Sequence, residues 1–392
     1  MKFSTQSLAA GLLAASGLLS ACGGGGDAPT GTLRLAMTDA PTCGFDRVDV
    51  TVQKVRVHPS SSAADADSGW SEVVLSPPQR IDLLSLTNGV LTELGQTTLP
   101  AGKYTQLRLV LAANDASNPL ANSITPTGGT ETALTTPSAT QSGLKMNVDI
   151  DVAPNKLADF ILDFDACKSF VKVGQSNSWI LKPVITVVPR LSDAGSRVVG
   201  YVSTALALGG TTVSVQQNGL VVKSTPPDPT GKFTLYPVPP GTYDLVVSAA
   251  GRATATITGV PVIDTAFTNV NASSAPIDPP ISTMRTASGT VATGSSPIIA
   301  TVAAGKAYTG GPTVLVAGAP VDGGTGAFSL ALPSGAPVKT SYVANATTLT
   351  FVADGAAPSG KYNLAATSGG ATKVVGIDVT GADSTGSAFA FP

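Results

Sequence analysis

One short motif occurs three times in the chain, and each copy is followed by residues that alternate in the manner of a β-strand. The copies have the form Pro-x-Gly-x-Tyr and read PAGKYTQLRLVL (Pro100–Leu111), PPGTYDLVV (Pro239–Val247) and PSGKYNLAA (Pro358–Ala366). Proline presets φ for a turn, and glycine permits positive φ. Every second residue of a strand lies on the same face. The motif therefore predicts three turns that each lead into a strand.

In two predicted strands, the apolar residues change from one face of the strand to the other partway along. Tyr104 does not share a face with the leucines that begin at Leu107, and in RVDVTVQKVRVH the valines up to Val52 and those from Val55 take opposite faces. A period-2 pattern that slips by one residue is what a β-bulge produces. We therefore expect a bulge in each of these strands.

Short strands separated by turn residues divide the chain into modules. The content of 42 Gly and 29 Pro, with only 12% charged residues, is typical of an exported β protein. Turn signals about every ten residues favour β-sandwiches, so we expect an all-β fold of several immunoglobulin-like or transthyretin-like sandwich modules in series. The expected bounds are 32–192, 196–272 and 284–392, with a Pro-rich linker at 273–283.

Two stretches leave alternatives open. Residues 116–143 are rich in Thr, Pro and Gly, which predicts either an exposed loop or a decorated hairpin. The third module has two candidates for the Pro-x-Gly turn, Pro333–Gly335 and Pro358–Gly360, so the sequence does not fix its strand register.

The N-terminus has the pattern of an export signal. Lys2 is followed by the apolar stretch Leu8–Leu19, which is shorter than the roughly 20 residues of a membrane-spanning helix. The next residues, Leu19-Ser20-Ala21-Cys22, resemble the lipobox of bacterial lipoproteins. We therefore expect a signal peptide at 1–21, lipidation of Cys22 and a Gly-rich tether over 22–31. The alternative is an ordinary signal peptide with an unrelated cysteine.

The resemblance to lipoproteins also implies a location. Such proteins carry acyl chains, palmitate among them, and each buried CH₂ contributes about 0.8 kcal/mol, so several chains anchor a protein stably. Residue 23 is Gly rather than the Asp that retains such proteins in the inner membrane. This implies a lipid anchor in the outer membrane, with the body on either its periplasmic or its outer side.

Two cysteines remain after Cys22. Cys43 and Cys167 are an even pair in an exported chain, for which a disulfide is expected. The bond would close a loop of more than a hundred residues and stabilise the fold by roughly 4 to 5 kcal/mol in the chain-entropy model. Two separate thiols are the alternative.

Two regions resemble known families. DPTGKFTLYPVPPGTYDLVVSAAGR, with Gly231-Lys232-Phe233 ahead of the Pro239 turn, resembles the carboxypeptidase-regulatory-like domain, a transthyretin-like sandwich of seven strands. LAMTDAP, VDVTVQKVRVH, LPAGKYTQLRLVL and LDFDACKS resemble the DUF4382 domain found in exported bacterial lipoproteins. The sandwich groups with carbohydrate-binding-like folds, which implies a glycan role without establishing one.

The chain offers little for catalysis. Its one histidine, His58, ends a predicted strand and is expected to be exposed, and no Gly-x-Ser-x-Gly elbow, Walker loop or dinucleotide fingerprint occurs. We therefore expect no cofactor and no catalytic residue. A single histidine also argues against a zinc site, so no metal is expected. The net charge of −2 gives no footprint for nucleic acid.

Carboxylates are the remaining candidates for chemistry. Asp149 with Asp151, and Asp163 with Asp165, each share one face of a predicted strand. Such pairs serve as the acid and base of glycosidases or as ligands of Ca²⁺. The plainer interpretation, a solvated strand face, is the one we favour. Asp39 in TDAP is expected to form a turn and cap its own backbone.

These features favour a non-catalytic, lipid-anchored envelope protein whose β-sandwiches serve adhesion, ligand binding or scaffolding. The expected partners are the membrane, through the lipid, and a polysaccharide or an envelope protein. A carbohydrate-binding protein is the first alternative, and it would need exposed aromatic rings. Trp70 follows a probable loop, whereas Trp179 begins an apolar strand and is expected in the core. An envelope hydrolase is the second alternative, for which no constellation of residues is present.

Overall fold

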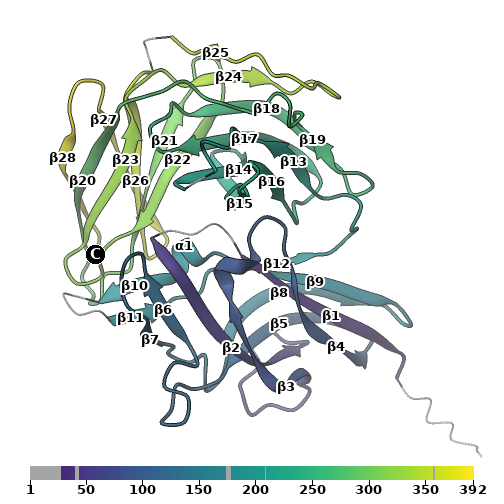
Figure 1. Ribbon diagram of the computed structural model, residues 1–392. Coiled ribbons are helices and arrows are strands. Elements are labelled where there is room, and N and C mark those ends of the chain that lie inside the picture. Colours follow the sequence, from purple (N-terminus) through teal and green to yellow (C-terminus); the bar gives the residue numbers. More distant parts are fainter. Residues whose placement is uncertain (1–27, 40–43, 174–177, 208, 356–357) are drawn as a thin grey trace, which may run out of the picture.

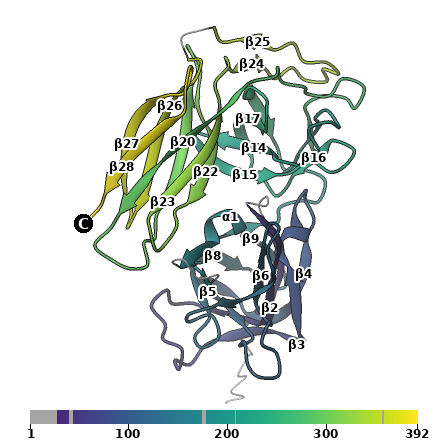
Figure 2. The same ribbon diagram turned by 60° about the vertical axis from the view of Figure 1, so that its left-hand side comes forward.

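The computed structural model describes residues 28–39, 44–173, 178–207, 209–355 and 358–392 (Figure 1). This part of the chain is almost entirely β, as predicted. Its helical elements are the 3₁₀ turn η1 (Leu83–Leu86) and the single-turn helix α1 (Ala166–Ser169). The strands form three sandwiches that pack against one another (Figure 2).

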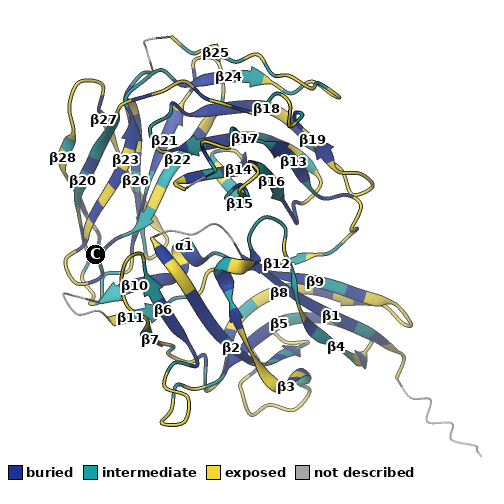
Figure 3. Cartoon of the chain, in the orientation of Figure 1, coloured by how far each residue is buried: buried dark blue, intermediate teal, exposed yellow. Residues whose placement is uncertain are grey.

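The first sandwich is built from twelve strands. They are β1 (Thr30–Asp39), β2 (Phe45–His58), β3 (Ser71–Asp82), β4 (Thr92–Pro100), β5 (Gly102–Leu111), β6 (Ser123–Pro126), β7 (Thr132–Thr135), β8 (Leu144–Val152), β9 (Leu157–Phe164), β10 (Phe170–Val173), β11 (Ser178–Leu181) and β12 (Ile185–Pro189). One sheet has the order β12-β9-β1-β4. The other runs β10-β11-β7-β6-β2-β5-β8, with β3 also paired to β2. The core lies between the two sheets (Figure 3).

Both parity changes are β-bulges, as predicted. The register of β2 against its neighbours shifts between Val52 and Lys54, and that of β5 against β8 shifts between Tyr104 and Gln106. The extra residue shifts the alternation of side chains by one position. Apolar side chains on either side of the bulge can therefore both face the core. Val52 and Val55 are accordingly both buried.

The Thr/Pro/Gly-rich stretch is a hairpin. Strands β6 and β7 pair in antiparallel fashion, and β6 also pairs with β2. Ile124, Leu134 and Ala139 are buried, so the hairpin is part of the sandwich. Of the two alternatives, the exposed loop is therefore wrong.

The second and third sandwiches share one topology. The second contains β13 (Val198–Tyr201), β14 (Thr211–Gln217), β15 (Leu220–Thr225), β16 (Lys232–Leu235), β17 (Gly241–Ala249), β18 (Ala255–Val262) and β19 (Thr268–Asn269). The third contains β20 (Met284–Ala292), β21 (Thr301–Ala307), β22 (Thr313–Pro320), β23 (Ala327–Pro333), β26 (Lys361–Ser368), β27 (Ala371–Asp378) and β28 (Ser384–Ala390). The small sheets are β16-β13-β19 and β23-β20-β28, and the large ones begin β15-β14-β17-β18 and β22-β21-β26-β27.

Matching residues explain why the two sequences fold alike. A Cβ on Gly200 would meet the ring of Phe233 at 2.5 Å, and one on Gly289 would meet the ring of Phe328 at 3.0 Å. Each phenylalanine is therefore able to lie across the neighbouring strand only because that strand has no side chain there. Gly231 and Gly326, two residues before each ring, have φ of 82° and 69°, a region that favours glycine.

An arm of the third module crosses to the second. Between β23 and β26 the chain forms β24 (Val338–Ser341) and β25 (Val352–Ala353). Strand β24 pairs in parallel with β18 and extends the large sheet of the second module. The turn at Pro358–Gly360 thus leads into β26, the equivalent of β17, whereas Pro333–Gly335 leads into the arm.

The Pro-rich segment 273–283 is not a free spacer. Ile277 is buried and forms a β-bridge with Val202, and Ile281 forms another with Arg252. Arg252 also pairs with Asp278 at 2.9 Å. The segment does connect the second and third modules in the sequence, but it is packed against the second. The sequence predicted a semi-rigid linker and did not indicate this packing. The apolar residues of the segment are spaced too irregularly among the prolines to suggest β-pairing.

Candidate functional site

The first carboxylate pair lies in solvent. Asp149 and Asp151 point outward from β8, and the Asp149 side chain is 80% exposed with Lys103 3.0 Å away. Both flank apolar residues that face the core, which is the alternation expected of a half-buried strand. The favoured interpretation, a solvated strand face, is confirmed.

The second pair is separated by its environment. Asp163 Oδ1 lies 2.6 Å from Nζ of Lys223, which comes from β15 of the second module and also donates to the Asp39 carbonyl at 3.2 Å. Both side chains are largely buried. Burial raises the pKa of Asp163, although Lys223 opposes this. The solvated-face interpretation is therefore wrong for Asp163, which forms an ion pair between modules.

Asp165 and Asp39 both organise α1. Asp165 accepts a hydrogen bond from the Lys168 N–H at 3.2 Å, as an N-cap residue does. Asp39 is the buried last residue of β1, and its Oδ1 accepts from the Ala166 N–H at 3.0 Å. Residues 40–43, which would form the expected turn with Asp39, lie outside the described part of the chain, so that turn stays a prediction.

Asn88 provides a second polar contact between the first two modules. Its N–H donates to Oγ1 of Thr225 at 2.6 Å, and its Oδ1 accepts from the Thr234 N–H at 2.6 Å. Tyr236 adds an apolar contact by packing against Ala36 and Ile161 of the first module. The modules are thus joined by buried groups of both kinds.

His58 and Trp70 belong to a cluster on the first module. His58 ends β2 as predicted but is half-buried, because its Nδ1 accepts from the Ser60 N–H and its Nε2 lies 3.0 Å from the Ser68 carbonyl. The guanidinium groups of Arg56 and Arg108 lie 4.4 and 4.6 Å from the centre of the Trp70 ring. These are cation–π distances. The cluster fixes the loop between β2 and β3.

The other tryptophan packs into the core, as expected. The Trp179 ring lies 5.1 Å from that of Phe45 in an edge-to-face arrangement. Among the residues that the structure describes, the one aromatic side chain with a large exposed fraction is Phe267, at 58%. An aligned row of exposed rings is therefore absent from the described surface.

The three motif tyrosines are structural. Tyr104 and Tyr243 donate to the carbonyls of Pro100 and Pro239, four residues before each, at 2.8 and 2.7 Å. Tyr362 instead donates to the carbonyl of Pro333 at 2.6 Å. Its hydroxyl therefore links both Pro-x-Gly candidates of the third module.

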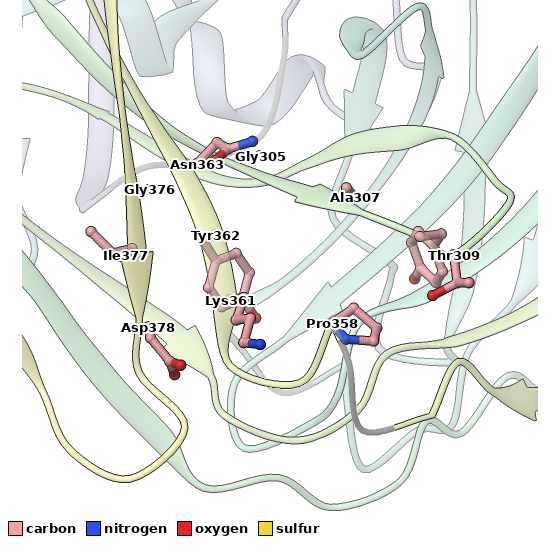
Figure 4. Close-up of a pocket in the computed structure, with 11 residues that line it drawn as sticks. Gly305, Ala307, Thr309, Pro358, Lys361, Tyr362, Asn363, Gly376, Ile377 and Asp378 are labelled. Carbon is pink, nitrogen blue, oxygen red and sulfur yellow. The ribbon is translucent and has the colours of Figure 1, made fainter.

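A hollow of about 660 Å³ lies at one end of β26 and β27. Figure 4 shows Thr309, Pro358, Tyr362 and Asp378 around it. The hollow is open, and its polar lining consists of Tyr308, Thr309, Lys361, Asn363 and Asp378. By itself it does not identify a ligand.

Lys306 contacts Pro358, Lys361 and Tyr362, three residues that line this hollow. It is 1% exposed, and burial lowers its pKa to about 8. A lysine of this kind can act as a nucleophile or base. Here its ammonium donates to the carbonyls of Pro358 and Lys361 and lies 4.0 Å from the centre of the Tyr362 ring. It therefore holds the turn before β26 in place.

Sequence reasoning missed Lys306, Lys223 and Asn88. Lys306 was detectable in principle, because it interrupts the apolar strand ATVAAGKAY. Lys223 and Asn88 carry no such signal, since their partners lie more than fifty residues away in another module.

Several predictions fall outside the described residues. Cys22 and Cys43 are among them, so lipidation and the Cys43–Cys167 disulfide stay predictions. Within the described ranges, no group of three or more His, Cys, Asp or Glu is arranged to hold a metal. No helix in the same ranges has the length and apolar character needed to cross a membrane.

Two family models match the chain. Residues 30–183 match the domain of unknown function DUF4382, and residues 197–274 match the carboxypeptidase regulatory-like domain. No curated protein sequence is significantly similar to the chain.

Several solved structures are similar in part. A chain of a cohesin–X-dockerin complex from Acetivibrio cellulolyticus is 28% identical, and the match covers 21% of this chain and 56% of that one, with a TM-score of 0.18. A streptococcal ancillary pilin is 10% identical over 90% of this chain and 97% of its own, with a TM-score of 0.16. The major pilin of Corynebacterium diphtheriae is 11% identical over 92% and 99%, with a TM-score of 0.18.

TM-scores this low support no argument about the arrangement of the modules. The family matches are more specific, because each coincides with motifs that carry the same resemblance in the sequence. The chain thus contains a region similar to the DUF4382 family, followed by one similar to carboxypeptidase regulatory-like domains.

Proposed function

We propose that this protein is a non-catalytic, lipid-anchored component of the bacterial outer membrane that acts as an adhesion or scaffolding body. The main support for the proposal is that its buried ionisable side chains make structural contacts. Asp163, Lys223 and Lys306, three ionisable side chains that are largely or fully buried, are each occupied by contacts that hold strands or modules together.

The packing of the modules supports a scaffolding role. Asp163 with Lys223 joins the first module to the second, and the arm strand β24 joins the second to the third. The Gly323 N–H donates to the Lys172 carbonyl at 3.0 Å and joins the third module to the first. Each module thus contacts the other two, so the body would present its surfaces in a fixed arrangement.

We favour an envelope protein over a polysaccharide as the partner. Sugar recognition by a sandwich commonly uses exposed aromatic rings, and Phe267 is the one aromatic side chain with a large exposed fraction among the described residues. Trp70 is in contact with Arg56 and Arg108, and Trp179 packs on Phe45. A glycan array with the full chain is the direct test. Saturable binding to one glycan would restore the carbohydrate alternative.

Cys22 provides the test of the anchor. Because the lipobox cysteine is the proposed lipid attachment site, Cys22→Ser should move the protein from the membrane pellet to the soluble fraction after a high-salt wash. The matched control is Ser20→Ala, which keeps a small residue before the cysteine and should stay membrane-bound. Retention of the Cys22→Ser protein in the pellet would contradict the proposal. Added protease on intact cells then reports which side of the membrane the body faces.

We also propose the Cys43–Cys167 disulfide, supported by residues on both sides of each cysteine. Asp39 is hydrogen-bonded to Ala166 at 3.0 Å, and the Phe45 ring lies 5.7 Å from that of Phe170. Peptide mapping without reductant should recover the linked pair. Reduction should destabilise the first module by about 4 kcal/mol in the chain-entropy model. Recovery of both cysteines as free thiols would refute the bond.

A further inference from the structure

The lipid anchor proposed for Cys22 determines which part of the body stays close to the bilayer, so this inference rests on that proposal. Cys22 precedes Pro29 by seven residues. An extended chain spans at most about 3.6 Å per residue, or roughly 25 Å in all. Pro29 is bound to the first module, because its carbonyl accepts a hydrogen bond from the Ala101 N–H at 2.7 Å. The surface around Pro29 is therefore held within about 25 Å of the lipid.

Two turns lie on either side of this attachment point. The turn from β4 to β5 contains Ala101. In the turn from β8 to β9, the Asn155 N–H donates to the Thr30 carbonyl at 2.8 Å, and the Lys156 carbonyl accepts from the Thr32 N–H at 2.9 Å. Figure 1 shows the start of β1 and the turn between β8 and β9 together at one outer corner of the first module. Both turns are therefore fixed next to the point where the tether enters the body.

The surface of these two turns is mainly apolar. We name residues 100–102 and 153–157 the anchor corner, and six of these eight residues have no polar side chain. The exposed apolar side chains on it are those of Pro100, Ala153, Pro154 and Leu157, the last at 49%. Lys156 is the one charged residue of the corner. Its side chain is exposed and makes no hydrogen bond or ion pair with any residue that the structure describes.

The charges at and next to the anchor corner cancel. Lys103 follows the corner on β5 and pairs with Asp149 at 3.0 Å, and Asp151 lies opposite Lys103 in the register of β5 and β8. With Lys156, these residues make two positive and two negative charges. Attraction to anionic lipids needs an excess of basic residues, so it is not the expected source of a contact. An apolar corner with one lysine suits the headgroup layer, where the lysine stem is buried and the ammonium stays in water.

We infer that the anchor corner is a membrane-contact surface, which rests on the phospholipid headgroups of the bilayer that holds the anchor. Leu157 and Pro154 enter the interface, and the Lys156 ammonium lies among the phosphates. Even a single myristoyl chain binds membranes only marginally, so the corner should not bind without the anchor. A short link, however, gives an effective concentration in the millimolar range. A contact that is too weak to form between separate partners is then populated.

Contact at this corner would also orient the body. Figure 1 shows the third module and the C-terminus on the side of the molecule opposite the start of β1. With the anchor corner on the bilayer, the third module is directed away from the membrane. The contact would thus present the outer modules to a partner in one orientation, as the proposed scaffolding role requires.

Acetylation of lysines measures the contact. The lipidated protein is added to preformed vesicles of phosphatidylethanolamine and phosphatidylglycerol, and the Cys22→Ser protein with the same vesicles is the reference. Peptide mass spectrometry follows the reaction with a water-soluble acetylating reagent. Lys156 should react about threefold more slowly in the anchored protein, which corresponds to contact for about two-thirds of the time. Lys373, which is exposed on the third module, should react equally in both.

The possible failures are distinguishable. Equal Lys156 rates in the two proteins, with the lipidated protein still on the vesicles, would overturn the contact and leave the anchor intact. Equal slowing of Lys156 and Lys373 would also overturn it, because the whole body would then be shielded. A protein that does not float with the vesicles would refute the anchor and the contact together.

Substitutions at the corner test which residues make the contact. Leu157→Asp should abolish the difference in Lys156 rate between the anchored protein and its Cys22→Ser form. Pro154→Asp lies in the turn outside the strands and should do the same, which guards against a folding defect at the start of β9. The matched control is Val343→Asp on the arm, where the valine is 59% exposed; it should leave the protection intact. Protection that survives both corner variants, or that Val343→Asp also removes, would overturn the inference.

Discussion

The second and third modules share seven strands in the same order but complete their large sheets in different ways. In the second module the sheet is covered at its edge by β24 and on its outer face by Val314 and Tyr308 of the third. In the third module β27 is open. The same fold therefore has a buried sheet edge where another strand pairs with it and an exposed edge where none does.

The covering arm is held by polar contacts. Lys339 on β24 pairs with Asp354 at 3.0 Å, and Asp354 accepts from the Thr309 N–H at 2.6 Å. Tyr308 and Thr256 share a hydrogen bond of 2.9 Å between the modules. The third module thus stabilises the second, and we find no comparable segment among the described residues that covers β27.

Truncation of matching residues should give the largest contrast. Ile257→Ala removes a side chain that the arm and the core enclose, so it should lower the free energy of unfolding by about 2 to 5 kcal/mol. Val375→Ala, at the equivalent open position, should cost less than about 1 kcal/mol. Denaturant unfolding, with hydrogen exchange of each module as the readout, measures the change in unfolding free energy for both variants. Equal costs would contradict the difference between the two edges.

Removal of the tyrosine hydroxyls should give a smaller contrast. Tyr362→Phe leaves the buried Pro333 carbonyl without its donor and should cost about 1 to 3 kcal/mol. Tyr243→Phe breaks a partly buried bond within one turn and should cost about 0.5 to 1.5 kcal/mol. Thermal unfolding of the two variants ranks them. A larger loss for Tyr243→Phe would show that the local bond matters more.

The third and smallest expected effect is that acid weakens the attachment of the arm formed by β24 and β25. Burial by itself would raise the pKa of Asp354, but the Thr309 N–H and the Lys339 ammonium outweigh it and lower that pKa. A carboxyl with a lowered folded pKa stabilises the fold above its unfolded pKa, near 4, and the effect is lost as pH falls through the folded value.

Hydrogen exchange of β24 and β25 should therefore accelerate below about pH 4, after correction for intrinsic rates. Asp354→Asn should show part of this loosening already at neutral pH and a weaker pH dependence. Exchange in β27, which has no arm, is the internal control. An unchanged arm in Asp354→Asn would show that backbone pairing alone holds it.

Local patterns were sufficient for the elements and for much of each module. The parity slips at Val52 and Tyr104 predicted real bulges because a strand can bury only one face without one. The Gly-x-Phe and Pro-x-Gly-x-Tyr motifs predicted the second sandwich, and the turn signals predicted a third. The same reasoning was wrong for Asp163, because its partner Lys223 is sixty residues away and on another module. Asp39 also accepts a hydrogen bond from Ala166, 127 residues further along the chain, and no local pattern indicates that contact.

By itself the sequence determined the all-β class and the three modules, because turn residues and period-2 alternation act over a few neighbouring positions. Only the tertiary structure decided that the Pro-rich segment packs against its neighbour, that the arm covers β18 and that β27 stays open. Pairing at a sheet edge depends on backbone groups that every residue carries, so side-chain patterns say little about which edges find a partner.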